Sequence, residues 1–229
     1  MRTYEKIETV FARDIEGTKK LIPGSFRNET VEFLQNNYWE FTEKLDGTNV
    51  RIHWDGHKVE YAGRTDRAEL PKNLLAVLNE IFGTPEAEEL FEQTFGEKEV
   101  ILFGEGYGGK IQGCGRGYRK DEWFMLFDVL IGDNYQSREW VEKTAQMFGI
   151  QAVPVLFTGA IFEGICYVCK HPKSVVAEND IYMEGVVGRP KVELKDRCGN
   201  RVIVKIKWND FKDFTDVFIG DVPFEDNKN

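Results

Sequence analysis

Residues 44–63 read KLDGTNVRIHWDGHKVEYAG, and this stretch predicts a β-hairpin that directly follows a lysine. Residues 48–54 (TNVRIHW) and 58–63 (KVEYAG) carry the branched and aromatic side chains typical of strands. The dipeptide Asp55-Gly56 lies between them, and both of its residues tolerate the positive φ angles of a tight turn. We therefore expect Lys44 at the mouth of a turn beside a sheet.

Helices and further strands surround the hairpin in the chain. The apolar spacing predicts one helix from Pro71 to a stop at Gly83, a second over about 85–95, and a third capped by Ser137. Short runs rich in aromatic and branched residues predict strands at 99–104, 123–131, 151–157, 165–169, 182–188 and 201–208. This mixture predicts an α+β domain built on antiparallel sheets, with helices outside them.

The composition is that of an ordinary soluble globular protein, with 229 residues, 41% hydrophobic and 30% charged. Because no repeat, low-complexity tract or Pro/Ser-rich linker divides the chain, we expect a single domain over 1–229. Its motif-bearing core would cover about 40–210, with residues 1–30 and the acidic tail after Asp216 peripheral. No apolar run approaches the roughly 18 residues of a membrane span, and the N-terminus lacks an apolar signal core, so we expect a cytoplasmic protein.

Basic residues are concentrated in two places although the formal net charge is −9. Residues 189–207 hold seven basic and two acidic side chains, and residues 110–120 hold four basic side chains and no acidic one. Such local clusters matter more for nucleic-acid binding than the total charge does. Solvated charged faces are the alternative explanation for both clusters.

The four cysteines are too few for a disulfide scaffold in a chain of this length, so we expect free thiols. Cys166, Cys169 and His171 have a spacing that a zinc knuckle would allow, with Cys114 or Cys198 as a further ligand. A structural zinc site, however, needs four ligands and usually a second paired motif, which the chain lacks. Cysteines in a buried strand are the alternative explanation.

Lys44 is a candidate nucleophile. A lysine amine attacks only in its deprotonated form, which burial or neighbouring cations favour. Lys205 and Lys207 would point to one face of a strand, because side chains alternate along it. They would supply a positive field and neutralise phosphate oxygens. The alternative explanation for a Lys-x-Asp-Gly sequence standing alone is a surface turn.

Five further elements follow Lys44 in a characteristic order. They are Arg64, Phe103-Gly104-Glu105-Gly106, Phe127-Asp128, Glu184-Gly185-Val186-Val187 and Lys205-Ile206-Lys207. Together with Lys44-Leu45-Asp46-Gly47 they resemble the nucleotidyltransferase motifs of the superfamily that contains ATP-dependent DNA ligases, RNA ligases and mRNA capping enzymes. The resemblance spans residues 44–207, which is most of the chain.

Finer details resemble the phage RNA ligases that seal nicks in duplex RNA. The similar stretches are Lys44 to Asn49 with Arg64-Thr65 behind it, Gly109-Lys110-Ile111-Gln112, and Glu184 to Pro190. DNA ligases and capping enzymes usually continue past the last motif into an OB-fold domain, for which the 22 residues after Lys207 are too few. The resemblance therefore implies a nucleotidyltransferase domain of two antiparallel sheets flanked by helices, with no OB-fold domain.

The resemblance also implies which residues bind the nucleotide. Lys44 would form the lysyl-AMP phosphoramidate, Arg64 would contact the ribose or a phosphate, and Glu105 would accept hydrogen bonds from ribose hydroxyls. Phe127 would stack on adenine, because an aromatic face suits a base. Phe124 lies three positions earlier on the same expected strand and points to its other face, so the choice between the two phenylalanines stays open.

A second set of residues is implied for the metal and the phosphates. Asp46 and Glu184 would orient the nucleophile and, with Glu105, hold waters of a Mg²⁺ or Mn²⁺ ion, since carboxylates suit the water shell of a hard cation. Lys205 and Lys207 would bind the α-phosphate of ATP. The carboxylates could otherwise be ordinary turn residues, and the lysines an exposed strand face.

The implied activity is ATP-dependent joining of a 5′-phosphate to a 3′-hydroxyl of RNA, in a nicked duplex on the phage resemblance, through lysyl-AMP and adenylylated-RNA intermediates. Thr48 and Asn49 would contact the nucleic-acid ends, and Lys110, Arg116 and Arg119 would bind its backbone. One alternative is a minimal ligase for DNA or RNA–DNA hybrids. Another is a non-catalytic nucleic-acid repair or binding module that retained the nucleotide pocket. No protein partner is indicated.

Overall fold

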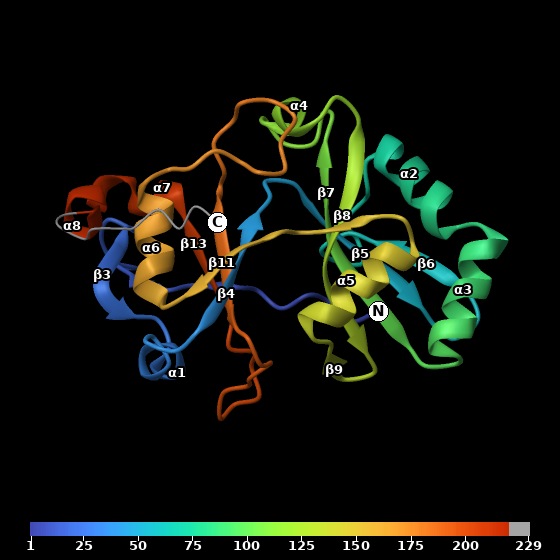
Figure 1. Ribbon diagram of the computed structural model, residues 1–229, viewed down its shortest axis with the longest axis horizontal. Helices are drawn as coiled ribbons and strands as arrows, with labels where there is room; N and C mark the ends of the chain where they lie inside the picture. Colours follow the sequence, from blue (N-terminus) through green and yellow to red (C-terminus); the bar gives the residue numbers. More distant parts are fainter. Residues whose placement is uncertain (220–229) are drawn as a thin grey trace. The chain divides into compact units, whose positions relative to one another are not determined.

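The computed structural model describes residues 1–219 and divides them into two compact units (Figure 1). Unit 1 comprises Met1–Lys6, Leu45–Pro154 and Ser174–Ile181, and unit 2 comprises Ile7–Lys44, Val155–Lys173 and the chain from Tyr182 onward. The division falls directly after the candidate nucleophile Lys44. Most of the predicted acidic tail lies in residues 220–229, outside the described residues.

Unit 1 contains a six-stranded sheet in the order β10-β8-β7-β5-β6, with β9 paired to β8. Its strands are β5 (Thr48–Trp54), β6 (Val59–Ala62), β7 (Val100–Gly108), β8 (Glu122–Ile131), β9 (Asn134–Tyr135) and β10 (Gln151–Ala152). All pairs are antiparallel except β10 with β8. The predicted hairpin is confirmed: Gly56 has a φ of +100°, and Asp55 Oδ1 accepts hydrogen bonds from the amides of His57 and Lys58, both at 2.9 Å.

Helices cover one face of this sheet. They are α2 (Lys72–Phe82), α3 (Pro85–Phe95) and α5 (Arg138–Met147), whereas Tyr118 of the short α4 (Gly115–Tyr118) packs in a separate cluster with Tyr107 and Met125. Leu78, Phe91 and Val141, from α2, α3 and α5, are fully buried in one core with Val50 and Phe124 of the sheet. Each such side chain contributes roughly 1.5–3 kcal/mol by leaving water.

The three predicted helices of unit 1 are confirmed, and so are the signals that delimit them. Gly83 ends α2. The Ser137 hydroxyl accepts from the Trp140 amide at 3.4 Å at the start of α5, and Thr84 caps α3 in the same way. Capping side chains satisfy amides that have no partner within the helix.

Unit 2 contains a five-stranded sheet in the order β1-β13-β12-β4-β11 and a separate β2-β3 hairpin. Its strands are β1 (Glu8–Thr9), β2 (Phe11–Arg13), β3 (Leu21–Phe26), β4 (Trp39–Lys44), β11 (Val155–Gly159), β12 (Gly185–Pro190) and β13 (Val204–Lys207). Its helices are α1 (Glu29–Phe33), α6 (Ile161–Cys169), α7 (Trp208–Phe211) and α8 (Thr215–Ile219), with a 3₁₀ turn at Lys212–Phe214. None of the helices within residues 1–219 has the length and apolar character needed to cross a bilayer.

The prediction of a strand at 165–169 is wrong, because these residues end helix α6. Ile161, Ile165 and Val168 recur at helical spacing and are buried against the sheet of unit 2. Helix and sheet approach closely here, since a Cβ at Gly164 would lie 2.5 Å from the Phe41 ring. The run 151–157 also differs from its prediction, since it is divided at Pro154 into β10 and β11, which belong to different sheets.

The N-terminal residues are more integrated than the expectation of a peripheral segment implied. Strand β1 pairs in parallel with β13, and Val10, Phe11 and Leu21 are almost completely buried in the core of unit 2. The expectation rested on the absence of motifs from residues 1–30, which carries no information about packing.

Candidate functional site

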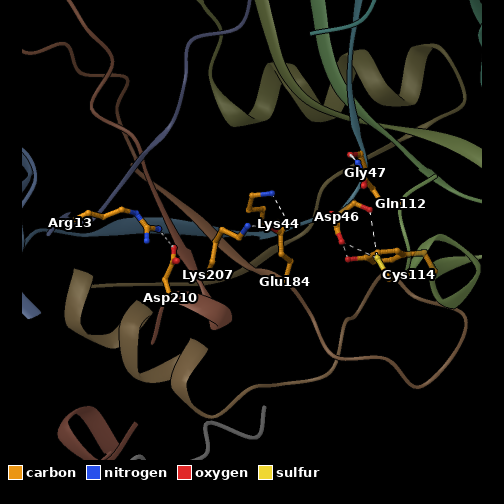
Figure 2. A network of polar contacts seen from close by, with 10 residues as sticks. Arg13, Lys44, Asp46, Gly47, Gln112, Cys114, Glu184, Lys207 and Asp210 are labelled. Atoms are coloured by element: carbon orange, nitrogen blue, oxygen red, sulfur yellow. Dashed lines mark hydrogen bonds and ion pairs between the residues drawn. The ribbon is translucent and has the colours of Figure 1, made fainter. Parts of the chain in front are cut away.

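Lys44, Glu184 and Lys207 meet on the sheet of unit 2 (Figure 2). Gly185 of β12 pairs with Lys44 of β4 on one side and with Lys207 of β13 on the other. A side chain at Gly185 would overlap the carbonyl oxygen of Ile206, so only glycine allows this approach of the strands. The register therefore places the Glu184 carboxylate beside both lysines.

One carboxylate is shared by two ammonium groups in this arrangement. Lys44 Nζ lies 2.5 Å from Glu184 Oε2, and Lys207 Nζ lies 2.6 Å from Glu184 Oε1. The three side chains are 26%, 13% and 31% exposed, so water screens them only partly. Lys205 shares a strand face with Lys207, as predicted, since Val204 and Ile206 point into the core. An anionic group such as a phosphate would meet an excess of positive charge here.

In unit 1 the Asp46-Gly47 turn is held by the segment that follows β7 (Figure 2). The Cys114 thiol donates to Asp46 Oδ2 at 3.2 Å, the Asp46 amide donates to the Tyr118 hydroxyl at 3.3 Å, and Gln112 Nε2 donates to the Gly47 carbonyl at 3.0 Å. Tyr118 is 1% exposed. The turn thus has a defined position, and the Asp46 carboxylate has a defined direction.

Glu105 lies beside this turn, on β7. A Cβ at Gly47 would lie 2.8 Å from Glu105 Cγ and would overlap the carbonyl oxygen of Gly106, so Gly47 permits the close approach. Asn49 of β5 is paired with Glu105 in the sheet register. Asn49 Oδ1 is buried, and no hydrogen-bond donor among residues 1–219 reaches it. An unsatisfied buried acceptor costs about 1–3 kcal/mol, which a ligand with a donor group would offset.

The two candidate phenylalanines differ in their surroundings. Phe124 is fully buried against Phe82, with ring centroids 5.8 Å apart. Phe127 is only partly buried and occupies a β-bulge, because Phe103 pairs with Asp128 and the next residue of β7 pairs with Leu126. The bulge reverses the alternation of β8 at this point. Phe127 is therefore the better candidate for contact with a ligand, and that role stays a prediction.

The candidates for nucleic-acid contact have unequal access to solvent. Lys110 and Arg116 are exposed, as is Arg64, which follows β6. Arg119 is half-buried, and its guanidinium lies 4.8 Å from the centroid of the Trp123 ring. Thr48 begins β5 and pairs with Gly106 of β7.

The basic cluster at residues 189–207 has fewer charges available for nucleic-acid binding than its composition suggested. Arg189 and Arg201 are each only 7% exposed. Arg201 forms a bidentate pair with Glu193, at 2.6 and 2.9 Å. Part of the positive charge of this segment is therefore neutralised by ion pairing within the protein.

The structure gives no support to a zinc knuckle. Cys166 and Cys169 are buried in α6, and no disulfide joins any two of the four cysteines, all of which lie within residues 1–219. Burial, together with neighbouring Cys166, raises the pKa of the Cys169 thiol to about 12, whereas zinc binds the thiolate. Within residues 1–219 no group of three or more His, Cys, Asp or Glu side chains is placed to hold a metal ion directly.

Site residues predicted from the sequence thus fall into two sets. Unit 2 holds Lys44, Glu184, Lys205 and Lys207, and unit 1 holds Asp46, Thr48, Asn49, Arg64, Glu105, Lys110, Arg116, Arg119 and Phe127. The peptide bond from Lys44 to Leu45 joins the two sets. Sequence reasoning did not find the Asp46 contacts of Cys114 and Tyr118, although both residues lie within the basic segment 110–120 that it had singled out.

Comparisons with known proteins identify the family from a sequence model and the fold from solved structures. A family model described as RNA ligase matches residues 37–207, a range that includes every predicted site residue. Structures of Naegleria gruberi RNA ligase are similar: one mutant with ATP and Mn has a TM-score of 0.63 at 17% identity, covering 92% of this chain and 57% of that one. The ligase with pyrophosphate has a TM-score of 0.61 at 19% identity, with coverages of 93% and 64%. No curated protein matches this chain in sequence.

These similarities confirm the predicted α+β nucleotidyltransferase fold with sheets flanked by helices. The chain spans only about three fifths of the length of the Naegleria proteins that it matches. The resemblance to the phage branch stays a prediction, because neither the family nor the fold distinguishes branches.

Proposed function

The chain belongs to the RNA ligase family of enzymes, and from this premise we propose that it is an ATP-dependent ligase that joins RNA 5′-phosphate and 3′-hydroxyl ends. Lys44 carries AMP between the two substrates in this proposal. Naegleria gruberi RNA ligase structures with ATP and Mn, and with AMP and Mn, support the choice of ATP and a divalent ion.

The shared carboxylate of Glu184 is the observation that carries the proposal. It orients the Lys44 amine, and the same carboxylate ties down Lys207, which with Lys205 forms the positive face of β13. The nucleophile on β4 and the cations on β13, which stabilise developing phosphate charge, thereby flank β12 on its two sides. Positioning and charge stabilisation are what phosphoryl transfer demands of a protein.

The first step is attack by Lys44 Nζ, after loss of a proton, on the α-phosphorus of ATP. A nitrogen–phosphorus bond forms, the bond to the β-phosphate oxygen breaks, and pyrophosphate leaves. Lys205 and Lys207 neutralise the charge that builds on the α-phosphate oxygens. Removing one such group typically lowers a rate about 10²- to 10³-fold.

Residues of unit 1 bind the rest of the nucleotide in this proposal. Glu105 accepts from the ribose hydroxyls, Arg64 contacts the ribose or a phosphate, and the Phe127 ring stacks on adenine. Phe127 is partly exposed and Arg64 is exposed, so both side chains are accessible to a ligand.

A Mg²⁺ or Mn²⁺ ion fits this donor set only through its waters. Asp46, Glu105 and Glu184 supply carboxylates, but within residues 1–219 these three groups are not placed to bind a metal ion directly. Mg²⁺ usually keeps several waters and binds one or two carboxylates together with substrate phosphates. Such an ion, arriving with ATP, would neutralise phosphate charge.

The later steps act on RNA. The 5′-phosphate oxygen attacks the AMP phosphorus and releases Lys44; the 3′-hydroxyl then attacks the activated 5′-phosphate and expels AMP. Lys110 and Arg116 bind the phosphate backbone of the RNA, and Thr48 and Asn49 contact the RNA ends. We infer a nicked duplex as the substrate from the phage resemblance. Matched nicked duplexes that differ only in the sugar at the junction test RNA against DNA and hybrid substrates.

Covalent labelling tests the proposal directly. Incubation of the protein with α-labelled ATP and Mg²⁺ should leave label on the protein in a denaturing gel, and Lys44→Ala should abolish it. Parallel reactions with GTP and NAD determine the cofactor. Absence of label from the wild type, or equal labelling of Lys44→Ala, would refute the assignment and favour a binding module without catalysis.

A further inference from the structure

Arg51, in the middle of β5, is the most deeply buried charged residue of unit 1. Its side chain is 0% exposed, which is rare for arginine unless its donors are all engaged. Nε donates to the Gly63 carbonyl at 2.7 Å, and Nη2 donates to Asp66 Oδ1 at 2.8 Å. These two acceptors stand on either side of Arg64 in the chain.

The remaining contacts of Arg51 fix it from the opposite direction. Nη1 donates to the carbonyl oxygens of Met1 and Arg2, at 3.1 and 3.2 Å. A planar guanidinium with its donors in a rigid fork can bind four acceptors at once, which the single ammonium of a lysine cannot do in the same geometry. The guanidinium thus links the start of the chain to the Gly63–Asp66 segment through four hydrogen bonds.

The segment from Gly63 to Ala68 is itself compact. The Ala68 amide donates to the Thr65 carbonyl at 3.1 Å, and a Cβ at Gly63 would lie 2.9 Å from Ala68 Cβ. Arg64 is exposed within this folded segment. Because both flanks are bonded to one buried group, the backbone of Arg64 has a fixed position while its side chain stays open to solvent.

We propose that Arg51 is a positioning residue for the ATP reaction, which holds the Gly63–Asp66 segment so that Arg64 is presented to the nucleotide. This inference rests on the proposed function and assigns to Arg51 no contact with ATP. If Arg51 had a merely structural role, its replacement would lower the stability of unit 1 whether or not Arg64 is present. If it positions Arg64, the effect of its replacement on ATP dependence requires the Arg64 side chain.

The test is a double-mutant cycle with Arg51→Met, Arg64→Ala and the double variant. The initial rate of covalent labelling is measured against ATP concentration, and each protein's unfolding transition is recorded beside it. We expect Arg51→Met to raise the ATP concentration for half-maximal rate about tenfold, and to change it less than about twofold when Arg64 is already alanine. Arg51→Lys should restore little of the loss.

Arg138→Met is the matched control. Arg138 is also largely buried in unit 1, but its hydrogen-bond acceptors within residues 1–219 are the Glu142 carboxylate and the Val153 carbonyl rather than groups of residues 1–2 or 63–68. It should lower stability without the change in ATP dependence.

Asp66→Asn provides a second variant if Arg51→Met does not fold, because Asp66 is 68% exposed and asparagine keeps an oxygen that can accept from Arg51 Nη2. It should raise the half-maximal ATP concentration in the same direction, by a smaller factor, and only while Arg64 is present. Equal effects with and without the Arg64 side chain, or an unchanged ATP dependence in a folded variant, would overturn the inference. An unlabelled wild type would instead overturn the proposed function.

Discussion

Replacement of Lys207 by methionine should separate catalysis from stability. The substitution keeps most of the apolar stem of the side chain and removes the ammonium group 2.6 Å from Glu184 Oε1. Glu184 retains its second partner, Lys44 Nζ at 2.5 Å, so no carboxylate is left buried without a cation. The fold should therefore tolerate the change.

The two expected effects differ greatly in size. A partly exposed lysine–carboxylate pair contributes about 0–1 kcal/mol to stability, because the loss of side-chain freedom and screening by water offset most of the attraction. A preorganised cation at a transferring phosphoryl group contributes far more to the rate, about 10²- to 10³-fold when it is removed. The labelling rate of Lys207→Met should fall by that factor while its unfolding midpoint stays within a few degrees of the wild type.

The assay is the initial rate of AMP transfer from labelled ATP at a saturating concentration, with thermal unfolding measured on the same samples. Lys20→Met is a matched control, since Lys20 Nζ lies 2.6 Å from Asp213 Oδ2 in the same unit, outside every motif. It should keep the wild-type rate. Wild-type labelling by Lys207→Met, or an equal loss in both variants, would refute the role given to the shared carboxylate.

Three further outcomes follow from the geometry. Gly185→Ala should lower both stability and labelling sharply, because its Cβ would overlap the Ile206 carbonyl oxygen; normal unfolding and labelling would contradict the register argument. A thiol reagent at pH 8 should modify exposed Cys198 long before buried Cys169, whose pKa burial raises to about 12; peptide mapping gives the order. Burial, with Lys173 nearby, lowers the pKa of His171 from 6.5, so the unfolded chain binds this proton at higher pH. Stability should fall as pH drops through 6.5, and in His171→Phe this part of the pH slope should vanish.

Local signals account for the elements that the sequence predicted well. Asp55 and Gly56 provide the hydrogen bonds and the φ angle of the hairpin within four residues of chain. Ser137 and Gly83 likewise act on the helix next to them. Each of these interactions is complete without the rest of the fold, so a short window of sequence contains all the information required.

Helix α6 escaped prediction for the opposite reason. A short apolar run fits a buried strand and a buried helix equally well, and only the surroundings decide between them. Here the sheet of unit 2 offers Phe41 as a packing surface, which Gly164 meets at close range. That contact joins residues more than a hundred positions apart, so the sequence around α6 does not reveal it.

Arg51 shows the same limitation within the candidate site. An arginine between Val50 and Ile52 alternates with apolar residues, so the pattern places it on a solvated face of the strand. The structure buries it instead, because carbonyl groups from residues 1–2 and from Gly63 converge on the guanidinium. The identity of a residue reveals its charge, but only the assembled fold reveals how many acceptors surround that charge.

The Lys-x-Asp-Gly motif is therefore fixed by two separate sets of contacts, although its charged residues are two positions apart. Lys44 ends the part of the chain that belongs to unit 2, and its amine is held through Glu184. Asp46 belongs to unit 1, where Cys114 and Tyr118 hold its carboxylate and its amide. Substitutions at Cys114 or Tyr118 should therefore act first on Asp46, whereas substitution of Glu184 should act first on Lys44. Covalent labelling of these variants would compare the importance of the orientation of the nucleophile with that of the motif's carboxylate.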